Sequence, residues 1–447
     1  MPLDDARLPP GPAWINLTLN PAFRFFSPMA LSDDVRTTAR LWIASFLAGI
    51  LGAFALSLFH GATQVVEWLL TRRTGSLVDD ALSLPAWGRV LVPTLGGLIG
   101  GLILSLGRRW ENAPHIDYID AARSGKIRLN DRTNTLRSLS SLFSVGSGAS
   151  IGREGPMVQL AATLSSWLAQ VYPVPDNQRN AIFICGIAAG IAAAYHAPIA
   201  GVVFILELAL GFFARHTIAP VLISAVTSSA LIFWMVEPSP LYIMPTLPPF
   251  HVTPRGLASA LVAGIGSGVL GYAFLWLIEK ARLGFARIPL WGRLALGGFL
   301  VGLISIPVPE VWGNGYDVVS KLLNGGLSWS STALVLLAKL LATTLSTASG
   351  AIGGIFTPTL FVGATGGYLF GFLSGNDPVV MSIVAMAAVL AAVTQAPMMS
   401  IVMVLEMTNQ FHLTLPVMLA CGTAYAISTQ FGAKPLYGNP IEQHSLH

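Results

Sequence analysis

Long runs without any charged residue are the feature of this sequence that most restricts its fold. No Asp, Glu, Lys or Arg occurs in residues 41–66, 218–236, 340–376 or 378–405. Several of these runs exceed the roughly 20 residues with which a helix crosses the hydrocarbon core of a bilayer. Charged residues make up 10% of the whole chain, against about 25% in an ordinary soluble domain. Because so few charges cannot cover a water-soluble surface, we expect an all-α polytopic membrane protein that faces lipid.

Basic residues are concentrated in one segment, and their position predicts the orientation of the chain. Of the 25 Lys and Arg residues, seven fall between two apolar stretches: Arg108, Arg109, Arg123, Lys126, Arg128, Arg132 and Arg137. Basic loops tend to lie on the cytoplasmic side of a membrane. Two expected crossings, near residues 41–60 and 86–106, separate this loop from the N-terminal tail, so we expect the N-terminus to be cytoplasmic too. The basic residues therefore reflect membrane topology, and we expect no nucleic-acid partner.

Comparing the chain with itself reveals a repeat with a period of about 200 residues. Four patterns of the first half return in the second half in the same order: Leu95-Gly96-Gly97 as Leu296-Gly297-Gly298, the cation Arg137 as Lys339, Gly152–Pro156 as Gly354–Pro358, and Ala197-Pro198 with Glu207 as Ala396-Pro397 with Glu406. Repeats built from broken helices are typical of transporter folds whose binding site lies near the bilayer midplane. We therefore expect two inverted-topology repeats that contain broken, half-spanning helices.

The repeat divides the chain into five parts. We expect a cytoplasmic tail at residues 1–40, a first membrane repeat at 41–237, a second at 255–438 and a short tail at 439–447. The segment 238–254 between the repeats contains six prolines. Since proline restricts the backbone and interrupts helices, this segment is expected to be an extended linker.

Four prolines are expected to open helices near a binding site: Pro156, Pro198, Pro358 and Pro397. Proline suits the first helical position, where its missing N–H costs no hydrogen bond. The segments after Pro156 and Pro358 run for about 16 residues before polar or glycine-rich sequence, which is short for a full crossing. Helix N-termini carry a partial positive charge and unpaired N–H groups. Several of them directed at one point would bind an anion weakly enough to release it.

Within this apolar frame, Glu154 is the strongest candidate for a functional residue. A carboxylate in membrane-buried sequence costs free energy unless it is paired, hydrated or protonated. Glu154 adjoins an expected helix N-terminus, where a carboxylate would mimic the bound anion and could occupy the site as a gate. The alternative is a structural pair with Arg153, although adjacent residues rarely face each other. Glu207 and Glu406 are related by the repeat, which favours paired supports of the scaffold.

At these residues the sequence resembles the ClC family of chloride channels and chloride/proton antiporters. Gly152–Gln159 is similar to the GREGPxVQ stretch of that family, Gly354–Pro358 to its GxFxP stretch, and Lys434–Tyr437 to its C-terminal KPLY. The resemblance extends from about residue 40 to residue 438. It implies a homodimer in which each subunit has its own chloride pathway between two inverted halves.

Taken motif by motif, the resemblance implies roles for individual residues. Glu154 would be the gating glutamate. The Tyr437 hydroxyl and the backbone N–H groups of Ile355 and Phe356 would bind chloride. The selectivity loops around the ion would be formed by six residues of the two matching stretches: Gly152, Arg153, Gly155, Pro156, Gly354 and Pro358.

Two positions depart from the usual family pattern. Ala113 falls where a serine is expected to donate a hydroxyl to chloride, so one hydrogen bond to the ion would be missing. Leu208 falls where typical antiporters carry a second acid, the internal proton donor, and leucine cannot titrate. Both departures resemble the ClcB-like bacterial branch, whose members are described as voltage-gated chloride channels that shunt charge during acid stress. This resemblance implies a location in a bacterial inner membrane.

The departures leave three anion-transport mechanisms open. Chloride/proton exchange needs a proton route to Glu154 that does not use position 208. A passive, voltage-gated chloride channel needs no such route. Fluoride export is the third, since fluoride-selective relatives also alter the first signature, but Tyr437 argues against it because those relatives are expected to lack this tyrosine.

An intramembrane hydrolase is the alternative from another class of protein. His196, Ser147 and Ser150 lie in or near apolar spans and would have to meet as a nucleophile and its base. No zinc-binding H-E-x-x-H and no dinucleotide-binding spacing occurs in the sequence, and these are patterns that metalloproteases and dinucleotide-binding enzymes carry. We therefore expect no enzymatic activity and no cofactor, and interpret His196 as a residue that caps a helix.

Overall fold

The structure is a computed structural model, and it describes residues 28–107, 117–125, 129, 131–210, 215–235, 239–245, 247–248, 253–434 and 436. Across these residues the regular structure is helical, and the extended pairing consists of one isolated bridge. The expectation of an all-α protein is therefore confirmed.

The first half of the chain forms nine helices and one π-helical turn within the described residues. Their bounds are as follows: α1 Pro28–Thr71, α2 Leu77–Ser83, α3 Ala86–Gly107, α4 Tyr118–Ser124, α5 Asp131–Gly146, α6 Glu154–Val171, α7 Asp176–Tyr195, α8 Pro198–Phe204, the π-turn η3 Ile205–Leu210, and α9 Arg215–Met235.

The second half forms eight helices and two short 3-10 turns within the described residues. Their bounds are as follows: α10 Pro254–Phe285, α11 Leu290–Ser305, η4 Pro309–Val311, α12 Tyr316–Leu323, α13 Trp329–Ala348, α14 Phe356–Ser374, α15 Pro378–Thr394, α16 Pro397–Thr408, η5 Phe411–Leu413, and α17 Thr414–Gln430.

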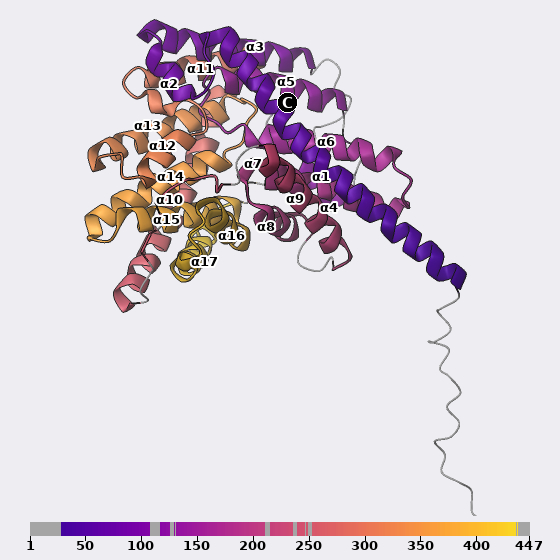
Figure 1. Cartoon of the computed structure of the whole chain (residues 1–447). Coiled ribbons are helices and arrows are strands. Elements are labelled where there is room, and N and C mark those ends of the chain that lie inside the picture. Colours follow the sequence, from indigo (N-terminus) through magenta and orange to yellow (C-terminus); the bar gives the residue numbers. More distant parts are fainter. Residues whose placement is uncertain are drawn as a thin grey trace, which may run out of the picture.

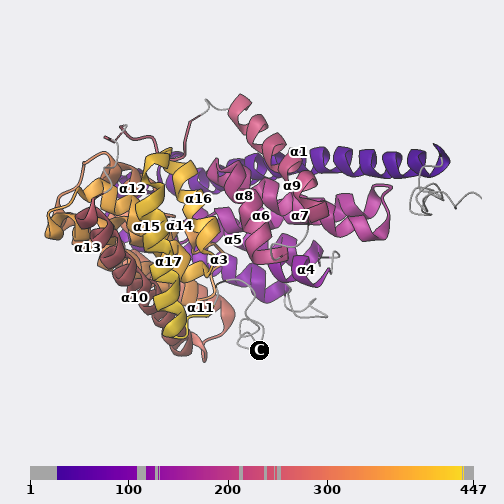
Figure 2. The ribbon, with the colours of Figure 1, turned by 90° about the horizontal axis from the view of Figure 1, so that it is seen from below.

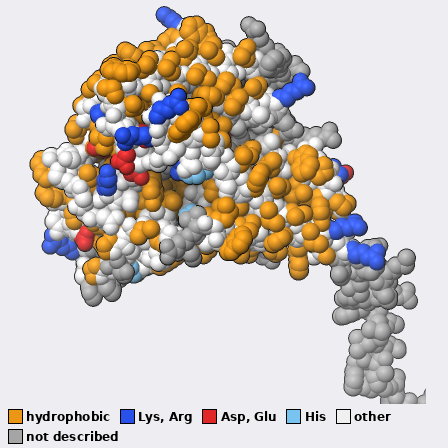
Figure 3. All heavy atoms as spheres, turned by 45° about the horizontal axis from the view of Figure 1, so that its top comes forward, with side chains coloured by type: hydrophobic (Ala, Val, Ile, Leu, Met, Phe, Trp, Pro, Cys, Tyr) orange, Lys and Arg blue, Asp and Glu red, His pale blue; other side chains and the backbone are white. Residues whose placement is uncertain are grey.

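Seven helices of the described chain are long and apolar enough to cross a bilayer, judged by length and composition. The spans are Arg36–Thr71, Ala86–Gly107, Thr217–Met235, Pro254–Phe285, Trp329–Ala348, Phe356–Ser374 and Phe411–Gln430. Shorter apolar helices lie between them in the sequence, among them α8, α11 and α16. Large hydrophobic side chains such as Trp234 and Leu373 are more than four-fifths exposed, at 85% and 81%, and hydrophobic side chains cover much of the face in Figure 3. This surface is suited to lipid, so the chain is a multi-pass membrane protein.

The two halves lie side by side (Figures 1 and 2), with α3 of the first packed against α11 of the second. A Cβ atom added at Gly97 would overlap the carbonyl of Leu294, and one added at Gly298 would overlap the carbonyl of Pro93. These two contacts are equivalent under the repeat. Gly97 is the repeat counterpart of Gly298, and Pro93 is the counterpart of Leu294. Such exchange of partners is the mark of a two-fold relation. The halves are therefore related by a pseudo-two-fold axis inside one chain.

Glycines make this approach of α3 and α11 possible. Further along the same pair, Gly101 faces the backbone of Trp291 and Gly302 faces that of Val90, each with 2.6 Å between an added Cβ and the nearest Cα. A side chain at any of these positions would push the helices apart, and small residues at helix crossings are typical of membrane proteins. The second glycine of each repeated Leu-Gly-Gly pattern, Gly97 and Gly298, thus lies in the contact between the two halves.

Candidate functional site

The paired glycine stretches of the repeat meet where the two halves come together. Gly152 and Gly354 form an antiparallel bridge with two reciprocal hydrogen bonds, 2.7 Å from the Gly152 N–H and 2.8 Å from the Gly354 N–H. A Cβ atom at Gly155 would approach the Cα of Gly354 to 3.2 Å, and one at Gly354 would approach the N of Gly155 to 3.3 Å, so this contact favours glycine in both stretches. Helices α6 and α14 begin two residues after the bridge, at Glu154 and Phe356.

Prolines at the third position of these two helices differ from the expected arrangement. Pro198 and Pro397 are the first residues of α8 and α16, as predicted. Pro156 and Pro358 instead stand two residues inside α6 and α14. The prediction of a first-position proline is wrong there because any of the first four N–H groups of a helix lacks an intrahelical acceptor, so proline costs no hydrogen bond at the third position either.

Glu154 lies at the first position of α6 and is 7% exposed. Its Oε1 atom accepts a 2.6 Å hydrogen bond from the Nδ2 of Asn314, which precedes α12. Its Oε2 atom is buried and has no hydrogen-bond partner among the described residues. Within the same part of the chain, no ion pair joins Glu154 to Arg153, so the structure does not support the alternative of a structural Arg153–Glu154 pair.

A pocket adjoins the bridge and is enclosed by helices of both halves. The lining residues come from six helices and the two glycine stretches: Tyr118, Gly155, Val158, Ile191, Tyr195, Phe204, Gly354, Phe356 and Met403. The Phe356 ring packs against the ring of Tyr195 with 4.8 Å between centroids. Tyr118 and Tyr195 are not predicted from the sequence, since neither belongs to a repeated pattern. Tyr118 begins the short helix α4, and Tyr195 ends the apolar helix α7.

Two of the four proline-marked helix starts do not face this pocket, because glutamates of the opposite half occupy them. The Glu406 carboxylate accepts hydrogen bonds from the N–H groups of Ile199 and Ala200 at the start of α8, at 3.1 and 2.7 Å. In the symmetric arrangement, Glu207 accepts from Met398 and Met399 at the start of α16, at 3.1 and 2.6 Å. A carboxylate at a helix N-terminus is stabilised by the helix dipole. Glu207 and Glu406 are therefore reciprocal supports between the halves, and the starts of α6 and α14 remain for an anion.

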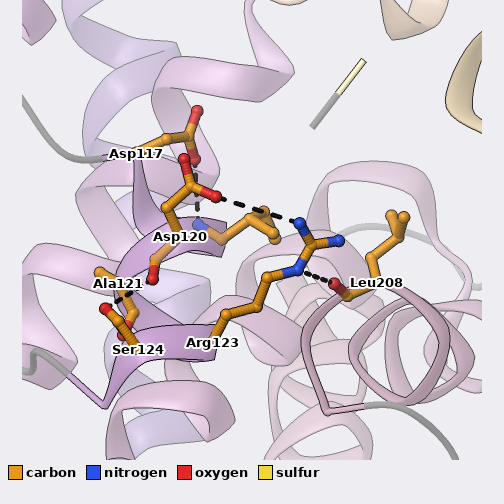
Figure 4. A network of polar contacts seen from close by, with 7 residues as sticks. Asp117, Asp120, Ala121, Arg123, Ser124 and Leu208 are labelled. Carbon is orange, nitrogen blue, oxygen red and sulfur yellow. Dashed lines mark hydrogen bonds and ion pairs between the residues drawn. The ribbon is translucent and has the colours of Figure 1, made fainter. Parts of the chain in front are cut away.

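Position 208 lies one helical turn beyond the pocket-lining Phe204, in the π-turn η3. The Leu208 side chain is 5% exposed. Its carbonyl accepts a 2.6 Å hydrogen bond from Nε of Arg123, and Figure 4 shows the side chain directed away from that guanidinium. Asp120 lies 4.0 Å from Arg123, and Asp117 caps α4 beside it. Single π-turns are frequent at functional sites.

Other predicted site residues are placed as follows. Ile355 and Phe356 are buried at the start of α14. Ala113 and Tyr437 lie outside the described residues, as do residues 1–27 and 437–447. His196 ends α7 in the left-handed conformation, and its Nδ1 lies 3.2 Å from the Ser239 carbonyl oxygen.

The serines weighed for a hydrolase have other partners. Ser147 donates to the carbonyl of Ser144, and the Ser150 hydroxyl pairs with that of Thr343 at 3.1 Å. No Ser-His pair forms in the described chain, and His196 caps a helix as expected, although it ends α7 and does not begin α8.

Comparison with known proteins agrees with this arrangement. A family model described as voltage gated chloride channel matches residues 96–429. A ClcB-like protein of Ralstonia nicotianae is 44% identical over 412 residues, which are 89% of this chain and 96% of the relative. The voltage-gated ClC-type chloride channels ClcB of Citrobacter koseri and Escherichia coli O157:H7 are 39% and 38% identical, each over 91% of this chain and 99% of the relative.

Solved structures share the fold. A slow cyanobacterial Cl-/H+ antiporter superposes with a TM-score of 0.79 at 24% identity, covering 91% of this chain and 98% of the antiporter. A CLC-type fluoride/proton antiporter superposes with a TM-score of 0.71 at 22% identity, with the same coverage of both chains. The predicted fold class, two inverted repeats with broken helices, is thereby confirmed. The family of these relatives is one of channels and transporters and not an enzyme class. This chain belongs to that family, the voltage gated chloride channel or ClC family.

Proposed function

We propose that this protein moves chloride across a membrane through a pathway between its two halves, with Glu154 as the gate. The observation that carries the proposal is the burial of Glu154 at the paired starts of α6 and α14, beside the pocket enclosed by both halves. Helix N-termini attract anions, and the carboxylate is itself an anion. Glu154 therefore occupies the place of a permeating ion and has to leave before chloride passes. Relatives named as chloride channels support chloride as that ion.

Several residues around the gate would each contribute to chloride binding. The backbone N–H groups of Ile355 and Phe356 would hold chloride, since the first N–H groups of a helix have no intrahelical acceptor. Tyr437 would add a hydroxyl, and Ala113 would add none. The selectivity loops would close the pathway around the ion through Gly152, Arg153, Gly155, Pro156, Gly354 and Pro358.

Two mechanisms compete within this proposal. In chloride/proton exchange, Glu154 takes up a proton each time chloride displaces it, and that proton has to cross the apolar turn at Leu208 by way of water or another group. In a passive channel, Glu154 moves aside without a proton being carried. The non-titratable side chain at position 208 favours the channel.

The setting of the transport step follows from the same considerations. We propose an inner-membrane location in a bacterial-type cell, a cytoplasmic N-terminus and a homodimer with one pathway in each subunit. The proposed division is a tail at 1–40, repeats at 41–237 and 255–438, a linker at 238–254 and a final tail at 439–447. The partners are then chloride, protons if exchange operates, lipid and a second copy of the chain.

Flux measurements in liposomes test the function and separate the mechanisms. Purified protein is reconstituted with a chloride gradient, and chloride efflux and proton uptake are recorded together for the wild type and for Glu154→Ala. We expect chloride efflux from both proteins. Proton uptake driven by chloride in the wild type, lost in Glu154→Ala, identifies exchange, and chloride efflux without proton movement in either protein identifies a channel. Absence of anion flux, with fluoride tested as well, contradicts the proposed function.

A further inference from the structure

We propose that Asn314 is a latch that holds Glu154 in the closed position, and that Lys339 positions this latch. The inference rests on the proposed gating function of Glu154. It adds Asn314, which no motif of the sequence indicates, and a role for Lys339, which the repeat only matches to Arg137. The latch reaches the gate from the other half of the chain, because Asn314 and Glu154 are 160 residues apart.

The orientation of the Asn314 amide is determined by its second hydrogen bond. The backbone N–H of Tyr316 donates to Oδ1 of Asn314 at 3.1 Å. A backbone N–H can only donate, so the amide oxygen must face Tyr316 and the NH₂ group must face Glu154. From there Nδ2 donates to the Glu154 carboxylate at 2.6 Å, and hydrogen bonds of this kind to a charged acceptor are about twice as strong as those between neutral groups.

The loop that carries Asn314 is held rigidly on both sides. Gly313 and Gly315 have positive φ values of 68° and 93°, a conformation that is costly for residues with a Cβ atom. A Cβ atom at Gly315 would also overlap the ring of Phe361. The hydroxyl of Tyr316 donates to the carbonyl of Leu241 in the segment between the halves, at 2.7 Å. These contacts therefore hold the Asn314 amide at a defined position next to Glu154.

Lys339 of α13 holds the same loop through two hydrogen bonds. Its side chain is fully buried, and Nζ donates to the carbonyls of Val311 at 3.0 Å and Gly313 at 2.7 Å. No acidic side chain of the described chain lies within ion-pair distance of Nζ. The negative charges that act on it are those of Glu154 and Asp317. Lys339 thus ties the loop to α13 and adds positive potential where Glu154 lies in the closed state and an anion in the open state.

One hydrogen bond makes this latch releasable. Only Oε1 of Glu154 is held, while Oε2 is buried without a partner in the described residues. Loss of a single hydrogen bond to a charged group changes an equilibrium by about tenfold or more. A gate held by one such bond stays closed most of the time and still opens when an anion competes for the helix starts.

Chloride efflux from liposomes of equal protein content, at one fixed pH on both sides, tests the latch. We expect Asn314→Ala to raise the efflux rate by about tenfold. Asn314→Asp keeps the size and the acceptor for the Tyr316 N–H but places an oxygen against Glu154, so it should raise the rate at least as much. In the Glu154→Ala background, Asn314→Ala should have no further effect. Asn324→Ala, which removes an exposed amide that bonds only backbone carbonyls of Ile243 and Ser320, serves as the matched control.

The outcomes separate the latch from the function on which it rests. Wild-type efflux in both Asn314 variants, with altered flux or coupling in Glu154→Ala, overturns the latch and leaves the gate. An equal rise caused by Asn314→Ala with and without Glu154 also overturns it, because the loop would then act on the pore and not through the gate. An unchanged efflux rate in Glu154→Ala refutes the gating role on which the latch rests, whereas absence of chloride efflux from the wild type refutes the transport function itself. Lys339→Met should raise the efflux rate as Asn314→Ala does, and the double variant should be no faster than Asn314→Ala alone. A double variant in which the two effects add would show that Lys339 does not act through Asn314.

Discussion

Three acids of this protein, the buried Glu154 and the half-buried Glu207 and Glu406, are satisfied in different ways. The difference separates the scaffold acids from the proposed gate. Glu207 and Glu406 each accept two backbone hydrogen bonds at the start of a helix in the opposite half. Glu154 accepts one, from a side chain, and keeps one oxygen without a partner among the described residues. An acid that is fully bonded to backbone cannot leave without exposing N–H groups, whereas one held by a single amide can.

The first prediction concerns the scaffold acids. Glu406→Gln keeps the size of the side chain but replaces one acceptor oxygen by a donor, which cannot face the N–H groups of Ile199 and Ala200. We expect the free energy of unfolding to fall by about 1–3 kcal/mol, the cost of a lost hydrogen bond to a charged group. Thermal unfolding in detergent measures the effect.

A matched surface substitution tests the interpretation. Glu279→Gln makes the same chemical change on an exposed position of α10 and should alter stability by no more than about 0.5 kcal/mol. Equal stability of Glu406→Gln and Glu279→Gln would show that the cap does not support the fold. Because Glu207 has the same arrangement, Glu207→Gln should match Glu406→Gln in its loss of stability.

At the residue scale, the sequence indicates a candidate functional side chain where its chemistry is unusual for its surroundings. It does not indicate a side chain whose partner is far away along the chain. Glu154 is identifiable because an acid in an apolar segment has to be explained. Asn314 is not, because Gly-Asn-Gly is typical of any turn, and its partner lies 160 residues earlier in the chain. Tyr118 and Tyr195 are missed for the same reason, since only folding brings them to the pocket.

At the scale of secondary structure, the two halves are joined by the packing of α3 against α11. At Gly298 an added Cβ atom would overlap the backbone carbonyl of Pro93. Backbone atoms cannot move aside as a flexible side chain can, so the helices themselves have to separate. Pro93 lies inside α3, and its position near this crossing leaves little freedom for the backbone.

The second prediction is therefore a loss of stability in Gly298→Ala. Overpacking of this kind costs about 1–3 kcal/mol, and here it should exceed the gain of about 1 kcal/mol that alanine brings to a helix. Gly266→Ala on α10 is the control, because nothing lies within 4 Å of its added Cβ, and it should be neutral or slightly stabilising. Thermal unfolding of the two variants gives the comparison, and a Gly298→Ala protein as stable as Gly266→Ala would contradict a close crossing.

Sequence patterns predict some elements well and cannot predict others. The repeat gives the two glycine stretches equivalent positions in the two halves, and the bridge between Gly152 and Gly354 joins these equivalent positions. The sequence pattern does not show which of the four proline-marked helix starts are free for an anion. The starts of α8 and α16 donate to glutamates of the opposite half, and these hydrogen bonds depend on how the halves fit together. The π-turn Ile205–Leu210 also carries no signal in the sequence, since its residues are ordinary helix formers.

On the scale of the whole molecule, the proposed pathway has a titratable group beside the pocket, Glu154, and none at the expected internal proton position, Leu208. Glu154 adjoins the pocket at the glycine bridge, and Leu208 lies one helical turn beyond the pocket-lining Phe204. Arg123 contacts the backbone of Leu208 and is partly exposed. The positive charge beside position 208 would compensate part of the cost of placing a carboxylate there.

The last prediction is that Leu208→Glu raises the number of protons carried per chloride. A carboxyl group at this position, close to Arg123, provides a proton acceptor at the end of the pathway where leucine provides none. Liposomes with a chloride gradient give chloride efflux and proton uptake for the wild type, Leu208→Glu and Leu208→Gln, the last being similar in shape and unable to titrate. We expect proton uptake per chloride to rise only in Leu208→Glu and to vanish again when Glu154→Gln is added, because a proton has to reach the gate to cross. Equal behaviour of the Glu and Gln variants, with chloride efflux intact, would mean that position 208 does not lie on a proton route, and the passive channel would then account for transport in this protein.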